Sequence, residues 1–397
     1  MKTCSGAAML VAFLAICDAA FVTLPIHSRK NPLKSPEHLA RLQVAAEVNG
    51  VSVPVKDWIA HTADLQWYTT VKVGTPPQNF DVIFDTGSFD MFIASKECTT
   101  CGHARTFDSS QSSTFSQEPN QPQSFTYGTG VDSTSLPPQG EGVGGTIVTD
   151  RVDIANLTVP SQQFLLCDRY DEFLADVPFD GVMGIGLVNQ TGLPSGKPWY
   201  WQLYYSGQIQ SPVFSFYYPP GRATGAEMTL GGVNPARYTG DITYIDLTDG
   251  GQFDVGVPAS YFGGKQSVIP ATGAILDSGT PFFTASASTV KDIYAALGSQ
   301  FKQLDQGGSW GAPCDVIDSL AVEMTFTLGS GSNTFNATMP KEAFNLGPYP
   351  GQQGMCQGVF SALEAGGSLI LGAPLLDRYY TVWDGLNYKM GFAQAKF

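Results

Sequence analysis

Short apolar runs that end at turn residues make up most of this chain. Residues 64–73 (DLQWYTTVKV) lead into Gly-Thr-Pro-Pro, and residues 79–85 (NFDVIFD) lead into Thr-Gly-Ser. The pattern recurs near the C-terminus, where residues 368–371 (SLIL) precede Gly-Ala-Pro and residues 378–384 (RYYTVWD) precede Gly-Leu-Asn. Runs of this length, rich in β-branched and aromatic residues and bounded by turn formers, are typical of β-strands.

Helical periodicity is confined to short stretches, of which residues 288–299 (STVKDIYAALGS) are the clearest. The composition favours many tight turns, since the chain contains 44 Gly and 26 Pro. Hydrophobic residues make up 43% of its 397 residues, enough for a large core in one two-lobed unit or two domains. We therefore expect a mostly β fold with a few helices.

Two segments repeat one pattern. Residues 81–88 (DVIFDTGS) and 273–280 (GAILDSGT) both place an apolar run before Asp, a hydroxyl residue, Gly and a second hydroxyl residue. Each is followed, just under a hundred residues later, by an apolar-apolar-Gly element, at residues 182–184 and 370–372. Two lobes with the same plan imply a pseudo-twofold axis, which would bring the two acidic loops face to face.

The repeated loops carry the candidate chemistry at Asp85 and Asp277. Gly87 and Gly279 allow the backbone to turn sharply beside each acid. Two carboxylates at hydrogen-bonding distance cannot both ionise readily, so such a pair holds one proton over a broad acidic range. It can then activate water for hydrolysis without a metal or a covalent intermediate. The hydroxyl residues expected to orient the carboxylates or join the loops are Thr86, Ser88, Ser278 and Thr280.

The net charge of −14 at pH 7 argues against a nucleic-acid partner, because phosphates would be repelled. A surface with few Lys and Arg suits a protein that works in acid, although an ordinary acidic secreted protein has the same composition. Serine, cysteine and zinc mechanisms are poorly supported, since neither HExxH nor GxSxG occurs. We expect no metal and no cofactor. The chain has only four histidines: His27, His38, His61 and His103.

The N-terminus has the pattern of a targeting segment. Residues 1–20 combine Lys2, an apolar run from Ala7 to Cys17 and small residues beyond it, which predicts a signal peptide. In residues 21–54 basic side chains outnumber acidic ones ahead of a strongly acidic body, which predicts a propeptide held partly by charge; the alternative is a disordered arm. With no further long apolar run, we expect no membrane anchor, and either secretion or delivery to a vacuole-like acidic compartment.

Five cysteines lie outside the predicted signal peptide, which fits two disulfides and one spare thiol. Cys98-Thr-Thr-Cys101 allows a zinc or thioredoxin-type interpretation, but a secreted chain without a second CxxC favours a small disulfide loop. Cys167, in the apolar run FLLC, is most simply a buried thiol. Three Asn-X-Thr sequons are candidate glycosylation sites, at Asn156, Asn189 and Asn336.

Longer segments around the two loops match a known family. Residues 66–88 contain a strand and the first acidic loop, residues 276–285 (LDSGTPFFTA) the second, and residues 179–186 (FDGVMGIG) and 369–393 the elements expected behind them. Residues 125–130 (FTYGTG) match the tip of a flap, a hairpin that closes over a cleft. Together these segments resemble the pepsin family of aspartic endopeptidases. The resemblance assigns substrate binding to Gly87, Tyr127, Gly128, Thr129, Gly279 and Thr280.

The resemblance implies a bilobal, mostly β acid-protease fold, with pseudo-twofold related lobes at residues 55–238 and 239–397 and an active-site cleft between them. It makes Asp85 and Asp277 the catalytic residues of an endopeptidase that cleaves proteins or peptides beside bulky hydrophobic residues. It also implies a propeptide that inhibits its own enzyme. We expect a monomer by default. The residues that the resemblance pairs are Cys98 with Cys101, Cys314 with Cys356, and Lys30 or Lys34 with the catalytic carboxylates.

Several positions depart from the family pattern. Phe92 stands where a tryptophan usually contacts the flap tyrosine, and Ala373 replaces an aspartate that usually follows Leu-Gly. Pro281 follows the second loop where a hydroxyl residue is usual, and the Gly- and Pro-rich residues 131–145 do not follow the usual flap return. None of these changes removes an acid, so they predict altered rate or specificity rather than loss of the chemistry.

Two other functions fit parts of the sequence. A pepsin-like body that has lost activity and binds proteins or glycans would share the fold, although such relatives lose an acid, a loop glycine or the flap tyrosine. A two-carboxylate glycosidase would also be acidic and secreted, but it would not require matched loops in two repeated halves. One Asp-Thr-Gly alone would be an ordinary turn, and the second copy favours the paired site.

Overall fold

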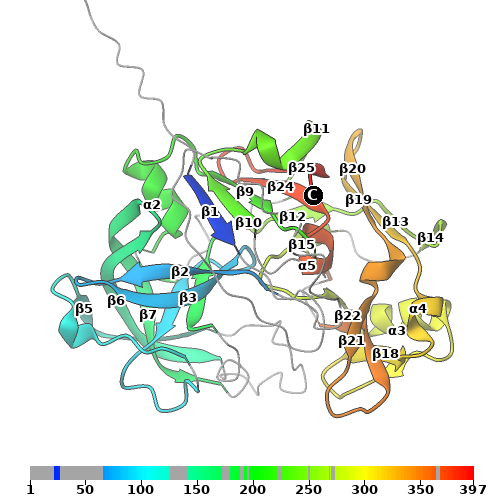
Figure 1. Cartoon of the computed structure of the whole chain (residues 1–397), viewed down its shortest axis with the longest axis horizontal. Coiled ribbons are helices and arrows are strands. Elements are labelled where there is room, and N and C mark those ends of the chain that lie inside the picture. The colour runs from blue at the N-terminus through cyan, green and yellow to red at the C-terminus, as the bar shows by residue number, and fades with distance from the viewer. Residues whose placement is uncertain are drawn as a thin grey trace, which may run out of the picture.

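The described residues of the computed structural model form four β-sheets, one in the first lobe, two in the second and one that joins them (Figure 1). Strands near the N-terminus gather on one side of the view, later strands gather on the other, and the joining sheet lies between them. This arrangement confirms the predicted bilobal, mostly β fold. The described residues are 22–26, 66–102, 104–125, 142–171, 179–187, 192–194, 196–220, 225–248, 251–267, 269, 273–363 and 367–397, with the backbone alone for 22–26 and 118–121.

The first lobe is built on a seven-stranded sheet. Its strand order is β2-β3-β8-β4-β7-β6-β5, and helix α2 (Trp199–Tyr205) packs beside β7. The predicted strands that flank Gly-Thr-Pro-Pro and precede Thr-Gly-Ser are confirmed as β2 and β3. The strands are β2 (Tyr68–Val73), β3 (Gln78–Asp85), β4 (Met91–Ala94), β5 (Ser116–Phe125), β6 (Val143–Ile154), β7 (Leu157–Tyr170) and β8 (Gly181–Gly184).

The second lobe repeats this plan in the order β12-β15-β23-β16-β22-β18-β17, with β21 also paired to β22. A smaller sheet, in the order β14-β13-β19-β20, completes this lobe. The strands are β12 (Asp254–Gly256), β13 (Ala259–Phe262), β14 (Lys265–Ser267), β15 (Gly273–Leu276), β16 (Phe283–Ala285), β17 (Lys302–Gln303), β18 (Ser309–Pro313), β19 (Met324–Ser330), β20 (Asn333–Met339), β21 (Asn345–Pro348), β22 (Met355–Ala362) and β23 (Leu369–Leu371).

The two large sheets match strand by strand. In each, the second strand runs parallel to the third, the third antiparallel to the fourth, and the fourth parallel to the fifth. The remaining neighbours are antiparallel in both sheets. The second strand, β3 or β15, ends at the acidic loop, and the third, β8 or β23, is the predicted apolar-apolar-Gly element. The internal repeat inferred from the sequence is therefore a structural repeat.

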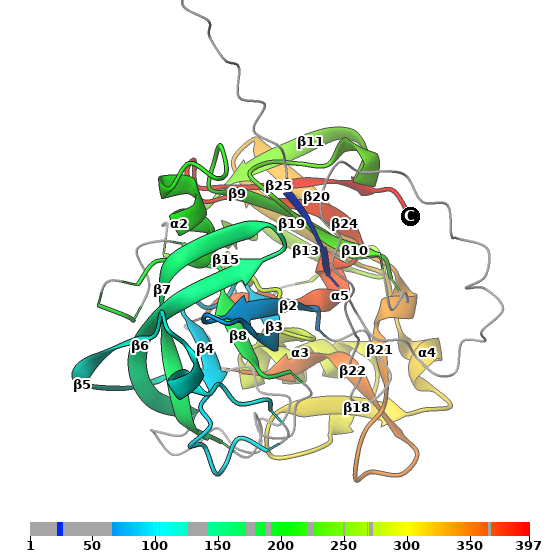
Figure 2. The same cartoon turned by 60° about the vertical axis from the view of Figure 1, so that its left-hand side comes forward.

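A six-stranded sheet combines strands from both halves of the chain (Figure 2). Its order is β1-β10-β9-β24-β25-β11, so the C-terminal strands β24 and β25 lie beside strands of the middle of the chain. At one edge, β1 adds an antiparallel strand to β10. The strands are β1 (Val22–Ile26), β9 (Val213–Tyr217), β10 (Ala226–Leu230), β11 (Tyr238–Asp246), β24 (Tyr379–Asp384) and β25 (Lys389–Ala395).

Helices are few and short among the described residues. The predicted helix near residue 290 is confirmed as α3 (Ala287–Leu297), which begins where the Ser286 side chain accepts the Thr289 N–H. Its apolar face buries Val290, Ile293 and Tyr294 in the second lobe. The other helices are α4 (Ile317–Leu320) and α5 (Ala373–Leu376), with 3₁₀ turns at Ser109–Gln111, Pro235–Arg237 and Lys341–Ala343.

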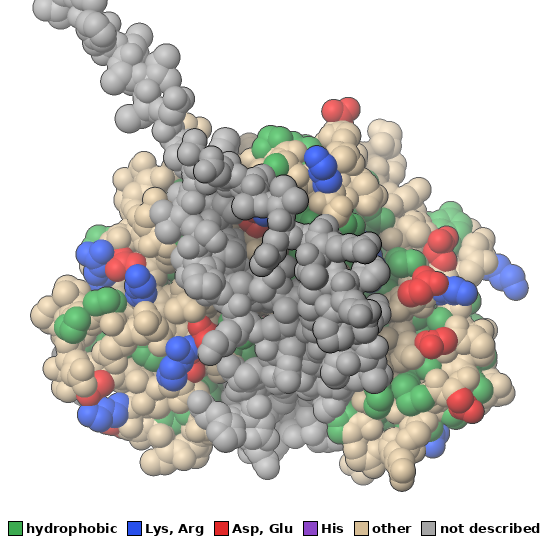
Figure 3. All heavy atoms as spheres, in the orientation of Figure 1, with side chains coloured by type: hydrophobic (Ala, Val, Ile, Leu, Met, Phe, Trp, Pro, Cys, Tyr) green, Lys and Arg blue, Asp and Glu red, His purple; other side chains and the backbone are tan. Residues whose placement is uncertain are grey.

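One continuous apolar core runs through both lobes, and its largest members are fully buried aromatic side chains such as Trp67, Trp199 and Trp383. On the face drawn in Figure 3, acidic and basic side chains of the described residues are scattered among uncharged side chains and backbone atoms. This follows from a composition with only 14% charged residues. Within the described residues, no helix is both long and apolar enough to cross a membrane.

The cysteines pair as the resemblance implied. The Cys98–Cys101 disulfide closes a small loop between cysteines three positions apart in the sequence. The Cys314–Cys356 disulfide joins β22 to the residue after β18, across a sequence separation of 42. Because the first pair forms a disulfide, its thiols are not available for zinc, and no cluster of metal-binding side chains occurs in the described part of the chain. Cys167 is a free, buried thiol on β7, as predicted, and burial raises its pKa.

Candidate active site

Each acidic loop begins where a buried parallel strand ends. On β3 the register pairs Asp85 with Gly184 of β8, and the N–H of Ile185 donates to the Asp85 carbonyl at 2.8 Å. On the other side, Leu276 pairs with Leu371 of β23, and the N–H of Asp277 donates to the Leu371 carbonyl at 3.2 Å. The apolar-apolar-Gly elements therefore fix the position at which each acid leaves its sheet.

Matching donors hold the two carboxylates. The N–H of Gly87 donates to Asp85 Oδ1 at 2.9 Å, and the Ser88 hydroxyl donates to Asp85 Oδ2. The N–H of Gly279 donates to Asp277 Oδ1 at 2.7 Å, and the Thr280 hydroxyl donates to Asp277 Oδ2. In both loops the glycine and the second hydroxyl residue thus satisfy one oxygen each.

The middle hydroxyl residues join the loops to each other. Thr86 N–H donates to Ser278 Oγ at 3.1 Å, and Ser278 N–H donates to Thr86 Oγ1 at 2.9 Å. Each hydroxyl then donates onward to the opposite strand, Thr86 to the Leu276 carbonyl at 3.1 Å and Ser278 to the Phe84 carbonyl at 2.7 Å. This reciprocal network is buried, so it fixes the spacing of the two lobes at the acids.

The loops approach each other as closely as glycine allows. A Cβ at Gly87 would stand 2.6 Å from Cγ of Asp277, and a Cβ at Gly279 would stand 2.5 Å from Oδ1 of Asp85. Both acids are buried, with 7% of Asp85 and 6% of Asp277 exposed. Burial first, and the negative charge of Asp277 second, raise the pKa of Asp85 well above its ordinary value of 3.8.

A charged cluster lies behind the first loop at the opposite end of β3 and β8. Asp180 accepts the backbone N–H of Arg105 at 2.6 Å, its Nε at 2.8 Å and the N–H of Asp81 at 2.7 Å. The Arg105 guanidinium also contacts Asp81 at 2.6 Å, and Thr70 donates to the same acid at 2.5 Å. This cluster, formed by Asp81, Arg105 and Asp180, was not found from the sequence, because no motif links Arg105 to either acid.

Gln66 makes a second contact that the sequence did not predict. It lies two residues before β2 in the first lobe, and its Nε2 donates to the Gly279 carbonyl of the second loop at 2.5 Å. Only 8% of Gln66 is exposed. No sequence pattern predicts this contact, since 213 residues separate its partners.

Comparison with known proteins identifies the group to which this geometry belongs. The model of the eukaryotic aspartyl protease family matches residues 66–395. The chain belongs to this family. Pepsin-2B of Gadus morhua is 30% identical over 86% of this chain and 99% of that protein. Cathepsin D of Chionodraco hamatus is 30% identical over 87% and 85%, and cathepsin E of Oryctolagus cuniculus 28% over 84% and 81%.

As a eukaryotic aspartyl protease, the chain is an aspartic-type endopeptidase, a hydrolase that acts in proteolysis. Three of its departures from the family pattern lie in buried surroundings, and most of the fourth, residues 131–145, lies outside the described residues. Phe92 packs edge-on against Tyr170 at 5.5 Å between ring centroids, and Ala373 is fully buried at the start of α5. Pro281, directly after the second loop, is also buried.

Some predicted positions lie outside the described residues. These are the flap residues Tyr127, Gly128 and Thr129, the sequon at Asn189, and both candidate propeptide lysines, Lys30 and Lys34. The other two sequons are described and exposed. Asn156 lies in the hairpin between β6 and β7, and Asn336 lies on β20, where its Oδ1 accepts the Thr327 hydroxyl at 2.9 Å.

Proposed function

We propose that Asp85 and Asp277 are the catalytic pair of a secreted endopeptidase that hydrolyses internal peptide bonds of proteins at acidic pH. One observation carries this proposal: the glycine of each loop lies against the carboxylate of the other. Each carboxylate also accepts a backbone N–H and a hydroxyl, so neither can rotate freely away from its partner. Family membership supports the same assignment.

In the proposed mechanism the pair shares one proton, which is the established behaviour of aspartic-protease dyads. Burial and the charge of Asp277 favour the protonated form of Asp85, so we assign the proton to Asp85 in the free enzyme. Asp277 takes a proton from water, whose oxygen attacks the peptide carbonyl carbon, while Asp85 donates its proton to the carbonyl oxygen. The neutral gem-diol then loses a hydroxyl proton to Asp85 as Asp277 protonates the leaving nitrogen and the C–N bond breaks.

We also propose that the enzyme is made as a precursor with a signal peptide at 1–20, a propeptide at 21–54 and lobes at 55–238 and 239–397. Strand β1 supports the propeptide, because Val22–Ile26 pairs with Leu230–Ala226 of β10 and so attaches that segment to the enzyme. The rest of the basic segment would inhibit the site through charge until acid weakens the ion pairs. The acidic surface and two disulfides suit secretion or an acidic vacuole-like compartment.

For the substrate we propose an extended peptide between the lobes, cleaved beside bulky hydrophobic residues, by analogy with the pepsin and cathepsin relatives. The exposed sequons at Asn156 and Asn336 support attached glycans in a secreted product. A mass decrease after enzymatic deglycosylation, absent in Asn156→Gln or Asn336→Gln, would identify the occupied site.

The decisive test is digestion of a denatured protein at pH 3 to 5 by acid-treated precursor. Asp85→Asn and Asp277→Asn should each lower kcat by at least about 10⁴-fold, because neither asparagine can take up or donate the shared proton. A statine-type mimic such as pepstatin should block the wild type. A folded, processed wild type as inactive as both variants would instead favour an inactive pepsin-like binding protein.

A further inference from the structure

The contact between Gln66 and Gly279 touches the catalytic loop itself. Gly279 supplies its N–H to Asp277 Oδ1 at 2.7 Å, and the Gln66 carboxamide donates to its carbonyl at 2.5 Å. The residue is therefore held at both ends, on one side by the acid and on the other by a side chain of the opposite lobe. A shift of this carbonyl would rotate the adjoining peptide group, which leads directly to Thr280.

Such a rotation would also move Thr280, which contacts the catalytic carboxylate. Its hydroxyl donates to Asp277 Oδ2, so the segment from Gly279 to Thr280 provides both of the donors that hold the second carboxylate. Hydrogen bonds to a carboxylate favour its ionised form and fix its orientation. Whatever fixes the Gly279–Thr280 peptide group therefore also fixes where the Asp277 carboxylate points.

No described side chain gives the first loop a matching support. Gly87 donates to Asp85 in the same way that Gly279 donates to Asp277. Within the described residues, however, no side chain donates to the Gly87 carbonyl. The contact is thus an asymmetry between two otherwise matched loops, and it is supplied by one buried carboxamide.

We propose that Gln66 is a positioning residue for Asp277, which acts by holding the Gly279 carbonyl and not by contacting the reacting atoms. This inference rests on the proposed function of the Asp85–Asp277 pair. It predicts that the loss of the donor lowers kcat while KM changes little, because a misoriented acid impairs the chemical step more than substrate binding.

The test uses the acid-activated enzyme with Gln66→Met and Gln66→Glu. Methionine keeps the length of the side chain and removes the donor. Protonated glutamic acid has one O–H donor and ionised glutamate has none, so Gln66→Glu should restore the contact only at low pH. Asp277 and Asp85 both lie beside Gly279, whose carbonyl Gln66 contacts, so their negative charge will raise the pKa of the new carboxyl.

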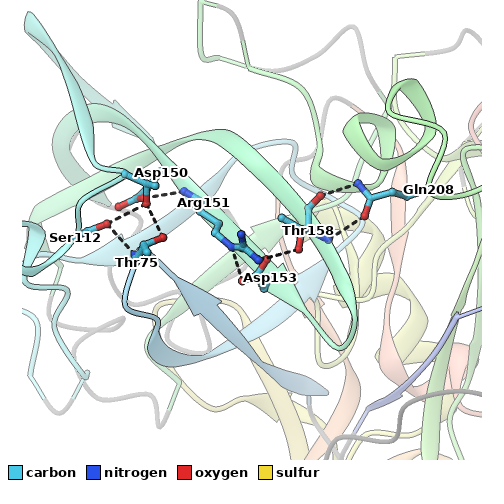
Figure 4. A network of polar contacts seen from close by, with 8 residues as sticks. Thr75, Ser112, Asp150, Arg151, Asp153, Thr158 and Gln208 are labelled. Atoms are coloured by element: carbon cyan, nitrogen blue, oxygen red, sulfur yellow. Dashed lines mark hydrogen bonds and ion pairs between the residues drawn. The ribbon is translucent and has the colours of Figure 1, made fainter.

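Gln208 offers a matched control on the same lobe. Its Nε2 donates to the Thr158 carbonyl at 2.7 Å and its Oε1 accepts the Thr158 N–H at 3.0 Å, at the start of β7 (Figure 4). Gln208→Met and Gln208→Glu therefore remove an equivalent carboxamide contact to backbone without touching either acidic loop.

We expect Gln66→Met to lower kcat by about tenfold or more with less than about a twofold change in KM, at all pH values. Gln66→Glu should match the wild type near pH 3 and fall toward the methionine variant as the pH rises through the raised pKa of the new carboxyl, while both Gln208 variants keep the wild-type profile. An unchanged kcat in Gln66→Met, an effect confined to KM, or a Gln66→Glu variant as impaired as Gln66→Met at pH 3 would overturn the proposal.

Two further measurements keep the outcomes distinct. Mass spectrometry of the activated enzyme must find Gln66 retained, and a mature chain that begins beyond it would contradict a positioning role. Asp277→Asn runs beside the Gln66 variants. If Asp277→Asn is active, the proposed function fails. If it is inactive while Gln66→Met is fully active, only the role of Gln66 fails.

Discussion

The two acidic loops have the same donors but different support. Asp85 and Asp277 each accept one glycine N–H and one hydroxyl, as two copies of one sequence pattern require. Behind the first loop, Arg105 and two acids connect β3 to β8, whereas no described ion pair connects β15 to β23. The second loop is instead held by Gln66 from the opposite lobe. The donors come from the loop itself and are repeated, while the support comes from distant side chains and is not.

Among changes that leave both acids in place, the largest effect should come from filling the space between the loops. Gly87→Ala and Gly279→Ala each place a methyl group within 2.6 Å of the other loop's carboxylate, so the acids must separate. We expect kcat to fall at least about 100-fold in both, since displacements near 1 Å at a catalytic group cost that much. Thermal unfolding, measured in parallel, separates a displaced pair from an unfolded lobe. Full activity in either variant would show that the pair tolerates a wider gap.

An intermediate effect on stability should distinguish the charged cluster behind the first loop from an ordinary surface ion pair. Arg105→Met leaves Asp180 buried without its guanidinium partner, which should lower the free energy of unfolding by about 1–3 kcal/mol after allowing for the half-exposed arginine. The control is Arg151→Met, which breaks the exposed pair with Asp153 drawn in Figure 4 and should cost less than about 1 kcal/mol. Denaturant unfolding at pH 6 measures both. Equal losses would mean that the cluster behind β3 is no stronger than a surface pair.

The smallest effect concerns the pH dependence of stability that arises because burial and the charge of Asp277 raise the pKa of Asp85. The pKa of Asp85 is raised above 3.8, so the folded chain binds more protons than the unfolded chain between those two pKa values. The stability contributed by this carboxyl is complete below its ordinary pKa and is lost as pH rises through the raised value. Asparagine does not titrate, so it escapes this loss. The Tm of Asp85→Asn relative to the wild type should therefore rise by a few degrees as the pH is increased from 3 to 7.

The control for this pH dependence is Asp108, whose pKa is lowered, chiefly by its hydrogen bond with Lys96. A lowered pKa has the opposite consequence, because stability is present above the ordinary value and is lost as pH falls. Asp108→Asn should therefore lose Tm relative to the wild type near pH 7 and not in strong acid. Two variants that shift in the same direction would contradict the assigned causes.

The sequence predicted those features that repeat or that depend on neighbours along the chain. The acidic loops, the apolar-apolar-Gly partners of β3 and β15, and helix α3 follow from patterns within a few residues. It did not predict Gln66, Arg105 or the sheet shared by both halves. These depend on which distant side chains and strands meet after folding, and a lone glutamine or arginine carries no periodicity that would mark it.

The buried thiol of Cys167 is a chemical probe for local opening of the first lobe. It lies on β7 beside β4, and within the described chain it is the only cysteine outside a disulfide. A thiol reagent can reach it only when that part of the sheet opens, so its rate of alkylation measures the free energy of local opening. The second lobe has no free cysteine among its described residues. Labelling with and without a bound inhibitor would therefore show how the inhibitor changes the free energy of local opening in the first lobe alone.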